Sequence, residues 1–119
     1  MQPDPVPASK TFKEGEFCKP LSPYAFSKYM FDCWLMNQEY SYQGFRYFNV
    51  YGPGEGHKGD QMSLISKFQK QAANDGVIKL FEGSDKYLRD CVSVHDVAVV
   101  HEKMMHETDA KGLYNLGTG

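Results

Sequence analysis

Apolar residues recur at helical spacing in two stretches of this chain. The first stripe consists of Met30, Phe31, Trp34 and Leu35. It predicts a helix over about residues 23–40, with Ser22 as its N-cap and Pro23 at the first helical position, which proline favours. The second stripe consists of Val97, Val100, His101, Met104 and Met105. It predicts another helix, which starts near Asp96.

Short apolar runs bounded by turn residues predict strands. The most distinctive run is rich in aromatic side chains and follows Gly44 directly, as is typical of a strand. The predicted strands are residues 45–51, 77–81, 91–94 and 112–116.

A glycine-rich segment, residues 52–59, predicts a loop after the first of these strands. Asp60 can cap a helix that follows the loop to about Asn74, and Gly76 supplies a stop. The resulting order is helix, strand, helix, strand, strand, helix, strand. It predicts an α/β fold with a parallel sheet and crossover helices.

Composition narrows the class of protein. Residues 1–20 contain four prolines and predict an extended loop or tail, which leaves residues 21–119 as a single domain. The net charge of −2 provides no basic field for nucleic acid, and no apolar run approaches the roughly 18 residues of a membrane span. The three cysteines are widely spaced, which favours a reduced, cytoplasmic protein over a disulfide scaffold or a zinc site.

The first candidate for chemistry is a tyrosine–lysine pair. Tyr24 and Lys28 are four residues apart and therefore lie on one face of the first predicted helix. An ammonium close to a phenol favours the phenolate, so the pair can act as a general base where an alcohol is oxidised. The pattern is short, however, and taken alone it more often indicates a surface aromatic residue beside a solvated lysine.

The surroundings of this pair make it more specific. Pro20 precedes the helix, and the following strand carries Arg46, Asn49 and the sequence Tyr51-Gly52-Pro53. The two linked motifs resemble the extended short-chain dehydrogenase/reductase family that acts on nucleotide sugars. The resemblance covers almost all of residues 16–119. It implies part of a Rossmann-type parallel sheet together with part of a substrate domain.

Four further elements are similar to the epimerases of this family that act on ADP-linked heptoses. They are Gly56-His57-Lys58-Gly59, Phe81-Glu82-Gly83-Ser84, Leu88-Arg89-Asp90 and Asn115-Leu116-Gly117-Thr118-Gly119. The resemblance implies that C6'' of an ADP-linked heptose is inverted by transient oxidation and reduction with a nicotinamide, NADP or alternatively NAD. This reaction belongs to the synthesis of the lipopolysaccharide inner core.

The resemblance also implies roles for individual residues. Tyr24 would be one catalytic base and Lys58 the second, on the opposite side of the sugar. Lys28 and the backbone of Val50 would bind the cofactor. Asn49 would contact the substrate through its amide, unless it only organises the following turn. Without the resemblance, Lys58 in a glycine-rich loop would more often be a solvated side chain.

The ADP part of the substrate would lie against one turn and one arginine. The residues of the turn are Phe81, Glu82, Gly83 and Ser84. Gly83 permits a tight turn and so leaves backbone N–H groups free for the ligand. The Arg89 guanidinium would pair with the diphosphate, and the alternative for Arg89 is an ion pair with Asp85 or Asp90.

Two positions depart from the family pattern. Asp60 stands where a serine usually contacts substrate, and because a carboxylate beside a diphosphate is unfavourable, it is better explained as a helix cap. Lys67 stands where a substrate-binding histidine is usual, although a lysine can still reach a phosphate. The histidines form no metal-ligand pattern: we interpret His57 as part of the loop structure and His101 as a core or boundary residue.

The family's glycine-rich cofactor-binding unit does not precede the tyrosine helix. We therefore interpret the chain as a fragment that lacks the N-terminal cofactor-binding half, and we expect it to be inactive in isolation. The full-length enzyme would form a homo-oligomer. The alternatives are another UDP- or dTDP-sugar epimerase or dehydratase of the family, and a non-enzymatic remnant that binds nucleotide sugars.

Overall fold

Two parallel strand pairs form the centre of the structure. The computed structural model describes residues 13–16, 19–107 and 109–119. Strand β1 (Gln43–Tyr47) pairs with β4 (Gly112–Leu116), and β2 (Asn49–Tyr51) pairs with β3 (Cys91–Ser93). Since parallel strands need crossover connections, the intervening chain carries the helices. The α/β fold class with parallel strands, predicted from the sequence, is confirmed.

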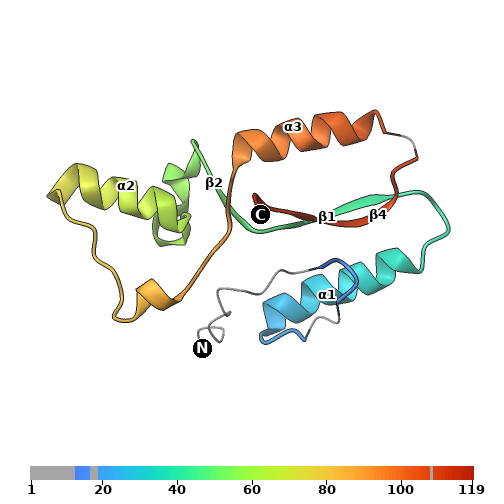
Figure 1. The fold of residues 1–119 in the computed structure, drawn as a ribbon, viewed down its shortest axis with the longest axis horizontal. Coiled ribbons are helices and arrows are strands. Elements are labelled where there is room, and N and C mark those ends of the chain that lie inside the picture. The colour runs from blue at the N-terminus through green and yellow to red at the C-terminus, as the bar shows by residue number, and fades with distance from the viewer. Residues whose placement is uncertain (1–12, 17–18, 108) are drawn as a thin grey trace.

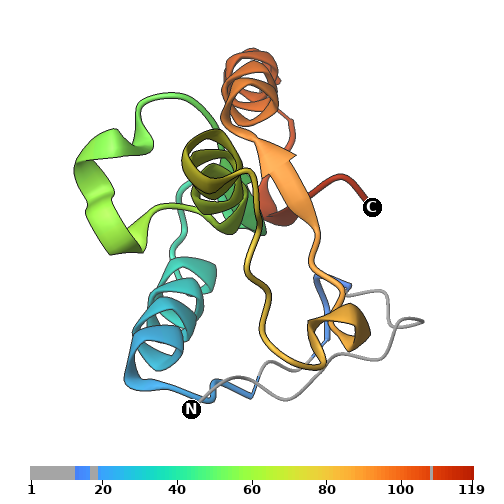
Figure 2. The same cartoon turned by 90° about the vertical axis from the view of Figure 1, so that its left-hand side faces the viewer.

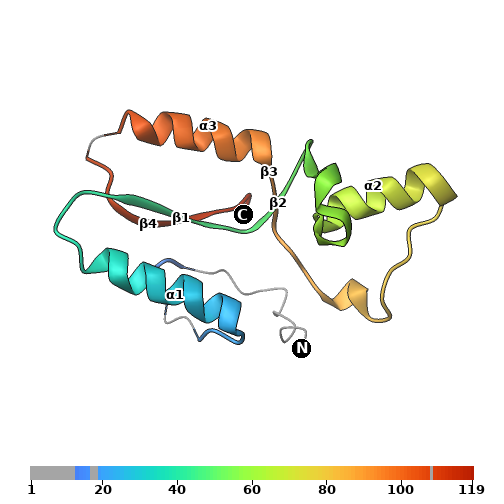
Figure 3. The same cartoon turned by 180° about the vertical axis from the view of Figure 1, so that it is seen from behind.

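Helices α1 (Pro23–Met36) and α3 (Val94–Met105) cover opposite sides of the β1–β4 pair (Figure 1, Figure 3). The start of α1 is as predicted, because the Ser22 hydroxyl accepts the Ala25 N–H at 3.1 Å. The predicted end at residue 40 is wrong. The Asn37 side chain donates to the Cys33 carbonyl at 2.7 Å, and this local bond satisfies a carbonyl of the last turn and closes the helix.

The predicted strand over residues 45–51 is divided in two because its halves pair with different neighbours. Phe48 lies at the division, and its N–H donates to the Leu116 carbonyl at 3.1 Å. The next N–H, that of Asn49, donates instead to the Asp90 carbonyl at 3.1 Å. The chain thus leaves β4 and joins β3 within one residue.

The strand predicted over residues 77–81 is not formed. All five of these residues are exposed, and neither strand pair of the described residues includes them. The Lys79 N–H donates to the side-chain oxygen of Gln71 at 2.9 Å instead. An apolar run forms a strand only where a second strand offers its backbone groups, and none lies beside this one.

Helix α2 (Leu64–Asp75) begins later than predicted. Its N-cap is Ser63, whose hydroxyl accepts the Ser66 N–H at 3.2 Å, so the interpretation of Asp60 as the cap is wrong. Asp60 lies in a 3₁₀ segment, η1 (Glu55–Gln61), which is kinked at Gly59 and includes most of the predicted loop. The predicted stop is confirmed, since Gly76 ends the helix in a left-handed conformation with φ of 65°.

The core is thin and lies around the strands. Its buried hydrophobic residues are Leu35, Val92 and Leu116. Helix α3, which begins two residues before Asp96, packs His101 on the Phe45 ring with centroids 4.6 Å apart. This confirms His101 as a core or boundary residue. Met105 does not belong to the apolar stripe, since 82% of it is exposed.

The predicted N-terminal tail lies largely outside the described residues. Within its described part, the Glu14 carboxylate accepts the Asn115 N–H at 3.0 Å, and this bond lowers the pKa of Glu14. The Glu14 backbone carbonyl accepts a hydrogen bond from the Arg46 guanidinium at 3.4 Å. Both contacts fix this segment against the β1–β4 pair. No helix within the described ranges is long and apolar enough to cross a membrane.

Asp90, directly before β3, is hydrogen-bonded to the start of β2 and to the segment after β4. Its carboxylate accepts the Thr118 hydroxyl at 2.6 Å and N–H at 2.9 Å, and the Gly119 N–H at 3.2 Å. Its backbone carbonyl accepts the Asn49 side-chain amide at 2.8 Å. The bonds from Thr118 hold the pKa of Asp90 below its ordinary value. This residue therefore holds the end of β4 against the start of β2.

Gly117→Ala tests this arrangement. A Cβ at Gly117 would overlap the Asp90 carboxylate and the Phe48 ring. We expect the free energy of unfolding to fall by about 1–3 kcal/mol, the usual cost of forcing an extra carbon into a packed site, as measured by urea unfolding. Gly56→Ala is the control, because a Cβ there meets no atom within 4 Å. Equal losses in both variants would show that Asp90 does not constrain position 117.

Candidate functional site

The predicted site residues come from segments that gather at one end of the structure. The carboxyl ends of β1 and β4 point to this end, and α1 begins there (Figure 1). Figure 2 looks onto it and shows η1 on one side and the second 3₁₀ helix, η2 (Ser84–Lys86), on the other. In open α/β sheets, ligands bind beyond the carboxyl ends of the strands.

Tyr24 and Lys28 lie one turn apart in the first half of α1. The Lys28 ammonium is 5.2 Å from the centroid of the Tyr24 ring, a distance at which a cation is attracted to an aromatic face. Tyr24 is 73% exposed, so a ligand can approach its ring and hydroxyl. The structure thus brings together the pair that the sequence indicated, and the catalytic role of the pair stays a prediction.

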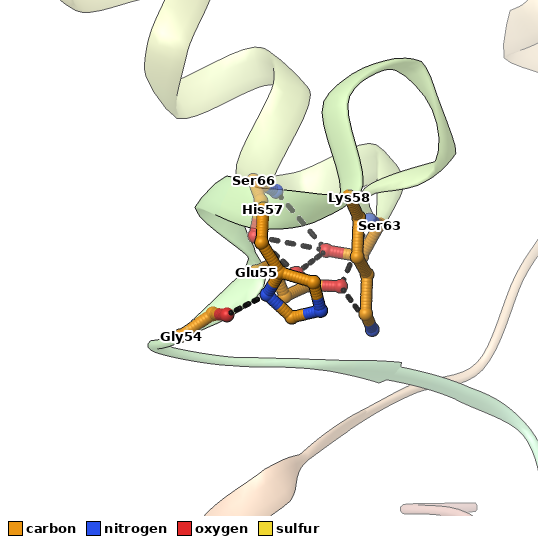
Figure 4. Close-up of polar contacts among 6 residues, drawn as sticks. All are labelled: Gly54, Glu55, His57, Lys58, Ser63 and Ser66. Atoms are coloured by element: carbon orange, nitrogen blue, oxygen red, sulfur yellow. Dashed lines mark hydrogen bonds and ion pairs between the residues drawn. The ribbon is translucent and has the colours of Figure 1, made fainter.

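Lys58 lies in η1, where its ammonium is 3.3 Å from the Glu55 carboxylate (Figure 4). The Lys58 side chain is 46% exposed and the Glu55 side chain 11%. The pKa of Glu55 is lowered from 4.5 to about 2, mainly because its carboxylate accepts hydrogen bonds from the hydroxyls of Ser63 and Ser66. The His57 ring bonds to the Gly54 carbonyl at 2.9 Å, so its interpretation as loop structure is confirmed.

Glu55 is a residue that the sequence reasoning missed. Glutamate and lysine three residues apart contact each other within a helical turn. That spacing is a signal in the sequence from which the contact between Glu55 and Lys58 could have been predicted.

Asn49 and Val50 form the first part of β2. The Asn49 amide donates to the Asp90 carbonyl, so its hydrogen bond joins β2 to the residue before β3 and does not lie within the turn that follows β2. Val50 is half-buried in the middle of the strand. Lys67 lies near the start of α2 and is half-buried. The structure leaves the binding roles of these three residues as predictions.

The segment around η2 forms the tight turn that Gly83 predicts. Gly83 has a φ of 77°, a left-handed conformation that glycine favours. Phe81 is 79% exposed. The expectation that the turn frees its N–H groups is wrong for Ser84, whose N–H donates to the Phe81 carbonyl at 3.0 Å. Glu82 is exposed beside them.

Arg89 is exposed directly before Asp90. Neither ion pair considered for it, with Asp85 or with Asp90, forms within the described ranges, where the Asp90 carboxylate bonds to Thr118 and Gly119 instead. The described residues also contain no group of three or more histidine, cysteine or acidic side chains placed to hold a metal.

A cavity of about 450 Å³ opens between α3 and the β1–β4 pair. Its lining includes Phe45, Val100, Met104, Tyr114 and Leu116. None of the predicted site residues lines it, so the cavity and the predicted site are separate features.

Comparisons with known proteins agree with the resemblance found in the sequence. Residues 1–117 match the NAD dependent epimerase/dehydratase family. Among solved structures, the chain is similar to the ADP-L-glycero-D-manno-heptose-6-epimerase of Helicobacter pylori, with 32% sequence identity and a TM-score of 0.82. The match covers 93% of this chain and 35% of that one. The likeness to ADP-heptose epimerases that the motifs indicated is confirmed, and the chain belongs to the NAD-dependent epimerase/dehydratase family.

Proposed function

We propose that this chain supplies the substrate-facing part of a nucleotide-sugar epimerase that inverts C6'' of an ADP-linked heptose. The observation that carries the proposal is that the start of α1, which contains the Tyr24–Lys28 pair, and η1, which contains Lys58, lie at the same end of the structure (Figure 2). The likeness to the Helicobacter pylori epimerase supports the choice of substrate.

The start of α1 fits a nicotinamide cofactor. The Lys28 ammonium has three donors, which suit the hydroxyls of a ribose, and the Tyr24 beside it is open to a ligand. Val50, in the middle of β2, would contribute backbone contacts. A bound nicotinamide, which we propose to be that of NADP, supplies the site that accepts and returns a hydride.

The reaction explains why two proton-transfer residues are needed. The inverted carbon bears a hydroxyl and has no adjacent carbonyl, so its C–H bond is not acidic enough for direct proton abstraction. Tyr24 takes the hydroxyl proton as the alcohol becomes a ketone. Lys58 donates a proton to the ketone oxygen when the alcohol forms again on the opposite face.

The remaining side chains bind the substrate. The exposed ring of Phe81 offers an apolar face to the adenine, and Glu82, Gly83 and Ser84 complete that turn. The Arg89 guanidinium pairs with the diphosphate. Asn49 and Lys67 add contacts to the sugar and to a phosphate.

Calorimetric titration of the chain with ADP-heptose tests the proposed binding. We expect ADP-heptose to bind at least about tenfold more tightly than UDP-glucose, and Arg89→Ala to reduce its affinity about 10- to 100-fold, the usual effect of losing a charge-assisted hydrogen bond. Lys103→Ala is the control for charge, because Lys103 is exposed on α3.

Each other outcome points to an alternative. Equal affinity for the two nucleotide sugars would favour a UDP- or dTDP-sugar enzyme of the family. Tight binding of ADP-heptose that NADP neither strengthens nor weakens would favour a remnant that binds nucleotide sugars without catalysis. An unchanged affinity in Arg89→Ala would contradict the diphosphate contact.

A further inference from the structure

Glu55 bonds to the start of α2 as well as to Lys58. Its Oε1 accepts the Ser63 N–H at 3.0 Å, and its Oε2 accepts the Ser63 hydroxyl at 2.6 Å and the Ser66 hydroxyl at 2.5 Å. The Lys58 ammonium lies 3.3 Å from Oε1 (Figure 4). Three of these four bonds therefore come from the N-cap and the first turn of α2.

The bonds from α2 are sufficient to hold Glu55 without Lys58. A carboxylate at a helix N-terminus is stabilised by unsatisfied N–H groups and by the helix dipole. The Glu55 side chain is mostly withdrawn from water, at 11% exposed, and a carboxylate in that position needs hydrogen bonds. These bonds also hold the pKa of Glu55 at about 2, which keeps it an anion at neutral pH.

Side-chain packing does not hold η1. The helix contains no buried residue. A Cβ added at Gly54, Gly56 or Gly59 would meet no atom within 4 Å, so open space lies beside each of these three glycines. The bonds of Glu55 to Ser63 and Ser66 connect this segment to the start of α2.

Lys58 has a long side chain that is 46% exposed. A flexible lysine in water loses side-chain entropy when it is held in one place, and it stays there only if a contact compensates for the loss. The fixed carboxylate of Glu55 provides this contact. It also restricts where the ammonium can lie with respect to the site.

We propose that Glu55 is a positioning residue for Lys58: it is anchored on the N-terminus of α2, attaches η1 to that helix, and holds the Lys58 ammonium in place. This inference rests on the proposed function, in which Lys58 transfers a proton to the sugar. It adds the residue through which the fold directs that lysine.

Competitive labelling of lysines tests the inference on the folded chain without substrate. The chain is treated with limiting acetic anhydride, and the labelling of Lys58 relative to Lys103 is measured by mass spectrometry. We expect Glu55→Gln to raise the relative labelling of Lys58 about threefold, the effect of losing a partly exposed ion pair. Glu55→Asp, which keeps the charge, should restore at least half of the difference.

The controls separate positioning from general loosening. Ser66→Ala removes one hydroxyl donor but keeps the Glu55 carboxylate, so Lys58 labelling should stay within about 1.5-fold of the unaltered chain. Glu102→Gln removes an exposed carboxylate on α3 and should have no effect. Unchanged labelling in Glu55→Gln, or an equal rise in Glu102→Gln, would overturn the inference.

A second measurement uses the unaltered chain and so does not depend on the folding of a variant. The Debye screening length is roughly 3 Å at 1 M salt, so high salt weakens an exposed ion pair such as that of Lys58 with Glu55. The relative labelling of Lys58 should therefore rise between 0.05 M and 1 M sodium chloride. No rise would also overturn the inference. If ADP-heptose binds but these labelling results are negative, the proposed function stands and the role of Glu55 does not.

Discussion

Tyr24→Phe is expected to lower the rate of ADP-heptose epimerisation by about two to four orders of magnitude, the contribution typical of a well-placed general acid–base. The substitution removes only the hydroxyl. The ring of Tyr24, which is 73% exposed and lies 5.2 Å from the Lys28 ammonium, is kept. The loss should therefore be in turnover and not in folding. The rate is measured by proton NMR of the two epimers, at saturating ADP-heptose and NADP, in an enzyme that contains this chain together with a cofactor-binding unit of the family.

Tyr40→Phe is the matched control for this variant. Tyr40 is 54% exposed and lies beyond the end of α1, so loss of its hydroxyl should leave the rate within about twofold of the starting protein. Circular dichroism of both variants checks that the fold is unchanged. A Tyr24→Phe protein that keeps more than a tenth of the original rate would contradict the role of Tyr24 as a proton-transfer residue.

Val92→Asp is expected to abolish folding of the chain. Val92 is 2% exposed, in the middle of β3, and a carboxylate there has no counter-charge. Domains of this size have a free energy of unfolding of only about 5–15 kcal/mol. Burying an unpaired charge costs several kcal/mol. Because few other residues are buried, little packing remains to compensate. Far-UV circular dichroism and the urea unfolding transition report the loss.

Val77→Asp makes the same chemical change at an exposed position. Val77 is 57% exposed and belongs to no strand of the described residues. The free energy of unfolding of the Val77→Asp chain should therefore stay within about 0.5 kcal/mol of that of the unaltered chain, as is usual for surface substitutions. A Val92→Asp chain with a normal cooperative unfolding transition would mean that the side chain at position 92 is not buried in solution.

Local chemistry explains what the sequence predicted correctly. The Ser22–Pro23 start of α1 and the Gly76 stop of α2 depend on residues within one turn of each boundary. The Tyr24–Lys28 contact follows from the geometry of a single helix. A pattern within a short window contains the information that decides such features.

Distant partners explain what the sequence did not predict. Residues 77–81 have the composition of a strand, and whether they form one depends on the backbone beside them. The strand over residues 45–51 divides at Phe48 because Leu116 lies beside one half and Asp90 beside the other. These neighbours are far away in the chain, so no local pattern reveals them.

The candidate site shows the same division. Only the resemblance to a family indicates a role for Lys58, because a lysine in a glycine-rich segment is by itself typical of a solvated side chain. Ser63 and Ser66, which anchor Glu55, are 8 and 11 residues from it in the chain. Ser63, and not Asp60, is the N-cap of α2. Ser63 also bonds to Glu55, so this difference from the prediction depends on the same group of residues.

The parallel pairing has a consequence for the kinetics of folding. The Gln43 side chain bonds to the carbonyl of Ala110, 67 residues further along the chain, and Asn49 bonds to Asp90 across 41 residues. Closing such loops costs entropy before any strand hydrogen bond forms, which slows folding. Helices α1 and α3 should therefore gain protection from amide hydrogen exchange before the strands do.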